Sequence, residues 1–171
     1  MFVACGDAWI VEEAWRRALK GYACGVDISP QRVARATDLR GVPGKLEFKP
    51  WDGTHLPCPN RSFDRVISTF ALEDCVQPAT LLREMHRVLQ PGGEVYMLEL
   101  QRHTSGPEDS ETAAFTAALA AAGFQDTREV MRRQLTTDAG GGLAGVIVRA
   151  RCAAPAVVPD PVERAPARPA A

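Results

Sequence analysis

Short apolar runs alternate with amphipathic segments along most of this chain, and this alternation limits the folds that the chain can form. An apolar run over 1–5 is followed by helically spaced apolar residues over 8–20 and by a second apolar run over 22–28. Helical spacing puts apolar side chains on one face, whereas a strand of a parallel sheet is apolar throughout. The pattern predicts a strand, a helix and a second strand, with Asp7 as the N-cap of the helix.

The alternation continues toward the C-terminus. Ser29 is a good N-cap and Pro30 suits the first helical position, so we predict a helix from Pro30 to about Arg40. Further strands are predicted at 45–50, 63–70, 94–100, 124–133 and 143–151, further helices at 78–89 and 110–122, and a loop at 52–62. Alternating strands and helices favour an α/β fold with a mostly parallel, Rossmann-like sheet. Gly140–Gly142 between the last two strands indicates an antiparallel C-terminal hairpin.

Length and composition favour one domain, over 1–152, followed by a disordered tail rich in Pro and Ala over 153–171. The formal charge of −1 gives no footprint for nucleic acid, and no apolar span is long enough to cross a membrane. The five cysteines are widely spaced and form no C-x-x-C pair, which favours neither a zinc site nor a disulfide framework. We therefore expect a cytoplasmic protein that binds no metal.

The residues that follow the early strands are the candidates for ligand binding, because ligands of such sheets lie beyond the carboxyl ends of the strands. The small-residue turn Cys5-Gly6-Asp7-Ala8 would let a backbone approach a ligand, although an ordinary tight turn is an equal alternative. Asp27 ends the second strand, where a carboxylate can accept both hydroxyl hydrogens of a ribose; the alternative is a capping or solvated residue. Asp52 could accept from an exocyclic amine such as adenine N6, and the Gly53 amide could bond a ring nitrogen, although Asp-Gly is also a common turn.

Four segments in this order resemble the class I S-adenosylmethionine-dependent methyltransferases, and most closely their small-molecule branch, which includes the quinone-biosynthesis enzymes. They are Gly25-Val-Asp-Ile-Ser29, Trp51-Asp-Gly-Thr-His-Leu-Pro57, Ser62-Phe-Asp-Arg-Val-Ile67 and Arg83-Glu-Met-His-Arg-Val-Leu-Gln-Pro-Gly-Gly93. The resemblance covers roughly residues 3–151. It implies a seven-stranded sheet with an antiparallel last strand and S-adenosylmethionine as cofactor. The cofactor-binding positions that it implies are Cys5, Gly6, Asp27, Ile28, Asp52, Gly53, Thr69 and Phe70.

The chain departs from the family at its first motif. The family has an acid followed by G-x-G-x-G, whereas Phe2-Val-Ala-Cys-Gly-Asp-Ala8 has no acid and has alanine at the first and third glycine positions. Each methyl group would be costly if the backbone there needs a positive φ, so we expect weakened cofactor binding. The first strand, central in the family's sheet, is short, and the family's N-terminal helices, which often cover the substrate, have no counterpart here. A second protomer or a protein partner could cover the cleft.

Our leading hypothesis is methyl transfer from S-adenosylmethionine to a small organic acceptor. Such a reaction needs mainly positioning, and a general base helps when the acceptor is a hydroxyl. Glu73, Asp74 and His103 are the candidate bases, although solvated or capping roles are favoured for all of them, and we assign no catalytic residue. A noncatalytic homologue that acts as a binding or regulatory partner is the alternative. A nicotinamide dehydrogenase is less favoured, because the first turn lacks G-x-G-x-x-G.

Overall fold

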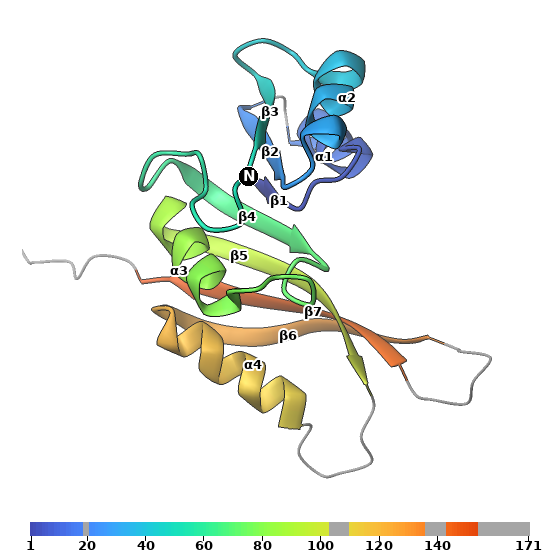
Figure 1. Ribbon diagram of the computed structural model, residues 1–171. Coiled ribbons are helices and arrows are strands. Elements are labelled where there is room, and N and C mark those ends of the chain that lie inside the picture. Colours follow the sequence, from blue (N-terminus) through green and yellow to red (C-terminus); the bar gives the residue numbers. More distant parts are fainter. Residues whose placement is uncertain (19–20, 103–109, 136–142, 154–171) are drawn as a thin grey trace, which may run out of the picture.

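The computed structural model describes residues 1–18, 21–102, 110–135 and 143–153. One seven-stranded sheet runs through the domain in the order β3-β2-β1-β4-β5-β7-β6 (Figure 1). Its N-terminal strands are β1 (Phe2–Val3), β2 (Ala23–Asp27), β3 (Leu46–Pro50) and β4 (Phe63–Thr69). They are followed by β5 (Leu89–Arg102), β6 (Phe124–Leu135) and β7 (Leu143–Cys152). Neighbouring strands from β3 to β5 pair in parallel, whereas β7 is antiparallel to both β5 and β6.

The topology confirms the predicted α/β class and the antiparallel C-terminal pair, with β7 inserted between β5 and the edge strand β6. The central strand β1 is only 2 residues long, as the sequence suggested. The strand order reverses between β1 and β4, which places a crevice beyond the carboxyl ends of these strands. The predicted tail, the Gly140–Gly142 turn and His103 lie outside the described residues, apart from Ala153 at the start of the tail.

Helices cover both faces of the sheet. Helix α1 (Trp9–Arg17) contacts β2 and helix α2 (Pro30–Arg40) contacts β2 and β3, whereas α3 (Pro78–Val88) and α4 (Ser110–Ala121) contact each other and β5 (Figure 1). The core is correspondingly divided. Leu81, Leu82, Met85 and Val88 of α3 belong to one buried cluster, and Val11, Val33 and Ala36 belong to the other. The strand β3 leads to β4 through the predicted loop rather than through a helix.

Two local predictions were wrong. Asp7 does not cap α1: the N-cap is Ala8, which has φ 62° and no side-chain bond, and the helix begins at Trp9. The Asp7 carbonyl instead accepts from Arg40 Nε at 2.9 Å. The second error concerns β5, which begins at Leu89 instead of Glu94. Its register with β4 shifts between Phe63 and Arg65, so that the residues before Glu94 form an irregularity where the sequence predicted only a helix stop.

Candidate functional site

The turn after β1 has an unusual backbone. Ala4, Gly6 and Ala8 all have positive φ, at 56°, 56° and 62°. The left-handed region is strained for alanine, because Cβ approaches the neighbouring carbonyl, and it is free for glycine. The two positions at which the family has glycine and this chain has alanine are therefore positions at which the fold requires a positive φ. The steric cost that we anticipated from the sequence is present in the structure.

Asp27 anchors this turn to the end of β2. Asp27 is only 3% exposed, and each of its carboxylate oxygens accepts one hydrogen bond from a backbone amide. Gly6 N donates to Oδ2 at 2.8 Å and Ser29 N donates to Oδ1 at 3.0 Å. Since a carboxylate oxygen offers two lone pairs, each oxygen can accept one further hydrogen bond. The arrangement is a fixed, ionisable acceptor suited to two adjacent hydroxyl groups.

A cavity of about 290 Å³ lies beside Asp27. Of the cofactor-binding residues expected from the sequence, Asp27, Ile28, Asp52, Gly53 and Phe70 line the cavity, whereas Cys5, Gly6 and Thr69 do not. Gly6 still acts on the site through its bond to Asp27. Five residues from three separate stretches of the sequence thus meet at the edge where the strand order reverses. The remaining lining residues are Ala4, Arg32, Trp51, Thr54, Ala71, Asp74, Cys75, Val76 and Gln77.

Asp52 presents a second fixed carboxylate. Its Oδ1 accepts from Thr54 N at 2.8 Å, Thr54 Oγ1 at 2.9 Å and His55 N at 2.8 Å. The hydrogen bonds from the Thr54 and His55 amides lower the pKa of the Asp52 carboxyl, which therefore stays ionised at neutral pH. Among the described residues none bonds Oδ2, so this oxygen can accept from a ligand. Gly53 has φ 87°, and a Cβ at its position would meet only Ile28 Cδ1, at 3.7 Å.

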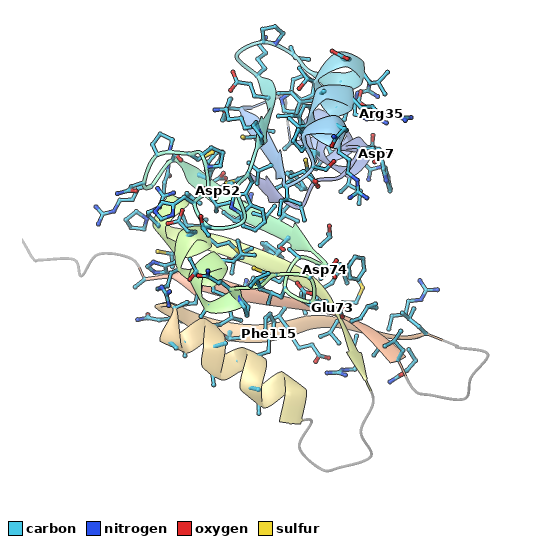
Figure 2. The ribbon with its side chains drawn as sticks, viewed as in Figure 1. Asp7, Arg35, Asp52, Glu73, Asp74 and Phe115 are labelled. Atoms are coloured by element: carbon cyan, nitrogen blue, oxygen red, sulfur yellow. The ribbon has the colours of Figure 1, made fainter. Side chains whose placement is uncertain are left out.

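The other wall of the cavity follows β4 and was largely missed by sequence reasoning. Phe70 has φ 55° and a side chain that stays 43% exposed, while its amide donates to Leu98 O at 2.8 Å. Asp74 lines the cavity, but Glu73, the other acid considered from the sequence, does not. Figure 2 shows Asp52 on the loop after β3 and Asp74 in the segment beyond β4. Val76 is 95% exposed, and this irregular segment has no periodicity that could have marked it.

The carboxylates of Asp27, Asp52 and Asp74 and the single guanidinium of Arg32 give the cavity lining a net negative charge. Such a lining favours a ligand that carries positive charge together with hydroxyl and amine donors. Trp51 contributes an indole Nε1 that is buried without a partner among the described residues. The site therefore combines acceptors at the ends of β2 and β3 with an apolar wall from Ile28 and Phe70.

Comparison with known proteins identifies the family and the fold of this chain. A family model described as a methyltransferase domain matches residues 2–97. The chain belongs to this family. The C-methyltransferase UbiE of ubiquinone and menaquinone biosynthesis from Coxiella burnetii is 37% identical over 80 residues, which are 47% of this chain and 32% of that protein. A demethylmenaquinone methyltransferase from Staphylococcus epidermidis is 32% identical over 103 residues, which are 60% of this chain and 43% of the relative.

The chain thus spans less than half the length of these curated relatives. Solved structures of this methyltransferase fold share its architecture at low identity. An arsenic(III) S-adenosylmethionine methyltransferase from Chlamydomonas reinhardtii has a TM-score of 0.74 at 20% identity, covering 91% of this chain and 63% of that one. The [4+2]-cyclase SpnF has a TM-score of 0.68 at 21% identity, covering 90% and 74%. These likenesses confirm the fold. The described helices include none long and apolar enough to cross a membrane.

Proposed function

We propose that this methyltransferase domain binds S-adenosylmethionine in the cavity beside Asp27 and transfers its methyl group to a small organic acceptor. The observation that carries the proposal is the Asp27 carboxylate, which is buried, fixed by Gly6 N and Ser29 N, and open to further donors. Membership of the methyltransferase family and the similarity to UbiE support it. The cofactor, when bound, would supply an electrophilic methyl group on a sulfonium.

The residues present fit such a cofactor. Asp27 would accept from the ribose hydroxyls, and Asp52 Oδ2 would accept from the adenine amine while Gly53 leaves room for the ring. The negative cavity lining suits the positive charge of a sulfonium. Asp74 lies at the same cavity and would hold or accept a proton if the acceptor is a hydroxyl, whereas a carbon acceptor needs mainly orientation.

Five unpaired thiols support a reducing compartment such as the cytoplasm.

Calorimetric titration with S-adenosylhomocysteine, the demethylated product, tests the proposal. We expect saturable binding by the wild-type domain and about 10- to 100-fold weaker binding by Asp27→Asn, since a hydrogen bond to a charged group contributes about 1.5–3 kcal/mol. The amide side chain of this variant would keep one oxygen to accept from a backbone amide, and circular dichroism would confirm folding. Asp38→Asn is the matched control, because Asp38 is an exposed residue of α2 away from the cavity lining. The absence of binding at millimolar ligand would refute the cofactor assignment.

A noncatalytic or partner-dependent role is the second candidate. The strained alanines at positions 4 and 8 favour it, because they weaken the turn that holds Asp27. A protein of the same fold, with a TM-score of 0.67 and 19% identity, was solved in complex with the Trm112 methyltransferase activator of Haloferax volcanii. Incubation with S-adenosylmethionine and reduced quinone-type acceptors, followed by mass spectrometry of the acceptor, separates the two. Tight cofactor binding without any methylated product would favour the second candidate.

A further inference from the structure

Cys24 and Cys58 form a pair that the proposed methyl transfer does not use. Their sulfur atoms lie 3.9 Å apart in the buried core, although the residues are 34 positions apart in the sequence. All five cysteines are free and lie within the described part of the chain, and among them only these two place their sulfur atoms in contact. The other buried thiol, Cys152, faces His86 Nε2 at 3.3 Å.

The fold positions both members of the pair. Cys24 lies in β2, a fully buried strand paired with β3 along its whole length. Cys58 lies on the loop between β3 and β4, and Arg87 of α3 holds the backbone there through bonds to Cys58 O at 2.9 Å and Leu56 O at 3.0 Å. Glu84 accepts from Leu56 N at 2.8 Å and reinforces this attachment. The bonds from α3 to this loop therefore bring the two sulfur atoms into contact, although Cys58 itself lies outside any helix or strand.

The two thiols differ in the way that a reactive pair requires. Cys58 is 9% exposed and Cys24 is 0% exposed, so a small oxidant reaches Cys58 first. The hydrogen bond from Cys24 lowers the pKa of the Cys58 thiol, and the positive charges of Lys49 and Arg87 act in the same direction. The same contact and burial raise the pKa of Cys24. Cys58 is accordingly the thiol that ionises and attacks, and Cys24 is the neighbour that can resolve the product.

We propose that Cys24 and Cys58 are a modification site at which hydrogen peroxide forms a reversible disulfide. The Cys58 thiolate attacks peroxide, its O–O bond breaks, and the thiol becomes a sulfenic acid while one water is released after protonation. The Cys24 sulfur then attacks the sulfenic sulfur, the S–S bond forms, and the hydroxyl leaves as a second water with the Cys24 proton. The two thiols lose two electrons and peroxide gains them.

Closing the bond requires the sulfur atoms to approach from 3.9 Å to about 2.0 Å. The movement falls on the loop side, because Cys24 is held within the sheet and Cys58 lies outside any helix or strand. The same loop begins with Asp52 and Gly53 at the cavity. Oxidation should therefore shift this wall of the cavity and change ligand affinity, a consequence that rests on the proposed function. Formation of the disulfide does not depend on the proposed function, since the disulfide can be mapped without ligand.

Peptide mapping tests the disulfide directly. The full chain is treated with hydrogen peroxide, blocked with iodoacetamide and digested with trypsin without reductant. We expect a linked pair of peptides, residues 21–32 and 46–61, that contain Cys24 and Cys58. The intact protein should lose about 2 Da, for two hydrogens, and tris(2-carboxyethyl)phosphine should restore it. Thiol titration should fall from five free cysteines by two.

If the exposure of each cysteine alone decided which thiols are oxidised, the order of oxidation would differ, and this difference serves as a control. Cys5 and Cys75 are more exposed than Cys24 and Cys58, so unselective oxidation would modify them first. Cys24→Ser and Cys58→Ser should each abolish the linked peptides, whereas Cys75→Ser, the matched variant, should leave them unchanged. Oxidation of Cys5 or Cys75 ahead of the pair would overturn the proposal. The wild-type map decides the question even if a serine variant folds poorly, since absence of the linked peptides in folded wild-type protein also overturns it.

Discussion

Replacing Ala4 with glycine should stabilise this domain, although glycine usually weakens a folded chain. Ala4 has φ 56°, in the left-handed region, where an L-residue costs about 1–2 kcal/mol. Glycine removes this cost but loses about 0.5–1 kcal/mol more backbone entropy on folding. Ala4 is only partly buried, so its methyl group contributes little. The free energy of unfolding should therefore rise by about 0.5–1 kcal/mol, from the difference of these two terms.

Two other alanines calibrate this expectation. Ala8 has φ 62°, but it is 0% exposed, so Ala8→Gly also loses a buried methyl group worth about 0.8 kcal/mol and should leave stability nearly unchanged. Ala14 lies in the middle of α1, where Ala14→Gly should destabilise by about 1 kcal/mol. Urea unfolding would resolve the three variants, because with a slope of about 2 kcal/mol per molar the Ala4→Gly midpoint should rise by about 0.3–0.5 M.

The same variant should bind S-adenosylhomocysteine severalfold more tightly than the wild type, since Ala4 lines the cavity and its methyl group occupies space there. Stability and affinity are independent readouts of one backbone conformation. If Ala4→Gly lowered the urea midpoint as much as Ala14→Gly does, the left-handed conformation of Ala4 would be refuted. If the urea midpoint of Ala4→Gly rises while its affinity for S-adenosylhomocysteine stays unchanged, the left-handed conformation of Ala4 is supported and its contact with the ligand is refuted.

Two carboxyls give further predictions with opposite pH dependence. The Arg87 guanidinium lowers the pKa of Glu84, so this pair stabilises the fold above the ordinary carboxyl pKa, and the contribution is lost as pH falls through the lowered value. Glu84→Gln should lower the free energy of unfolding, measured with urea, by about 2 kcal/mol at pH 7 and by much less at pH 3. An equal loss at the two pH values would exclude the ion pair with Arg87 as its cause. Burial raises the pKa of Glu99 to about 7, so its ionisation opposes folding as pH rises from 4 to 7. The free energy of unfolding of Glu99→Gln should equal that of the wild type at pH 4 and exceed it by about 3 kcal/mol at pH 8. A difference that stays constant across pH would contradict the raised pKa of Glu99.

Much of the fold was predictable because its signals are local. The start of α2 follows from Ser29 and Pro30, and the Ser29 hydroxyl accepts from Arg32 N in the structure. The start of β5 was not predictable in this way. Leu89 enters the sheet because it pairs with Phe63 across the register shift, and such a partner distant in the sequence leaves no local pattern. Asp7 failed as a cap because the left-handed backbone at Ala8 starts the helix one residue later than the capping pattern requires.

The candidate site likewise has one part that local sequence signals predict and one part that they do not. Asp27, Asp52 and Gly53 lie at or just beyond the ends of strands, so the sheet topology alone brings them to one edge. The wall formed by Phe70 and the irregular residues up to Gln77 has no period, and nothing in the sequence marks which of its side chains face the cavity. Arg32 lies in the first turn of α2, where helical spacing does not distinguish the cavity from solvent.

The turn after β1 links the stability of the fold to the occupancy of its cavity. Ala4 and Ala8 together cost about 2–4 kcal/mol in the left-handed region. The opposing bonds are Gly6 N to Asp27, which involves a charge and contributes about 1.5–3 kcal/mol, and three more that contribute about 1 kcal/mol each: Cys5 N to Val26 O, Ala8 N to Cys5 O and Arg40 Nε to Asp7 O. These bonds exceed the cost of the two alanines, so the turn holds the Asp27 carboxylate in place. A ligand that bonds Asp27 would meet an acceptor that is already fixed, and its binding would add to the stability of the folded domain.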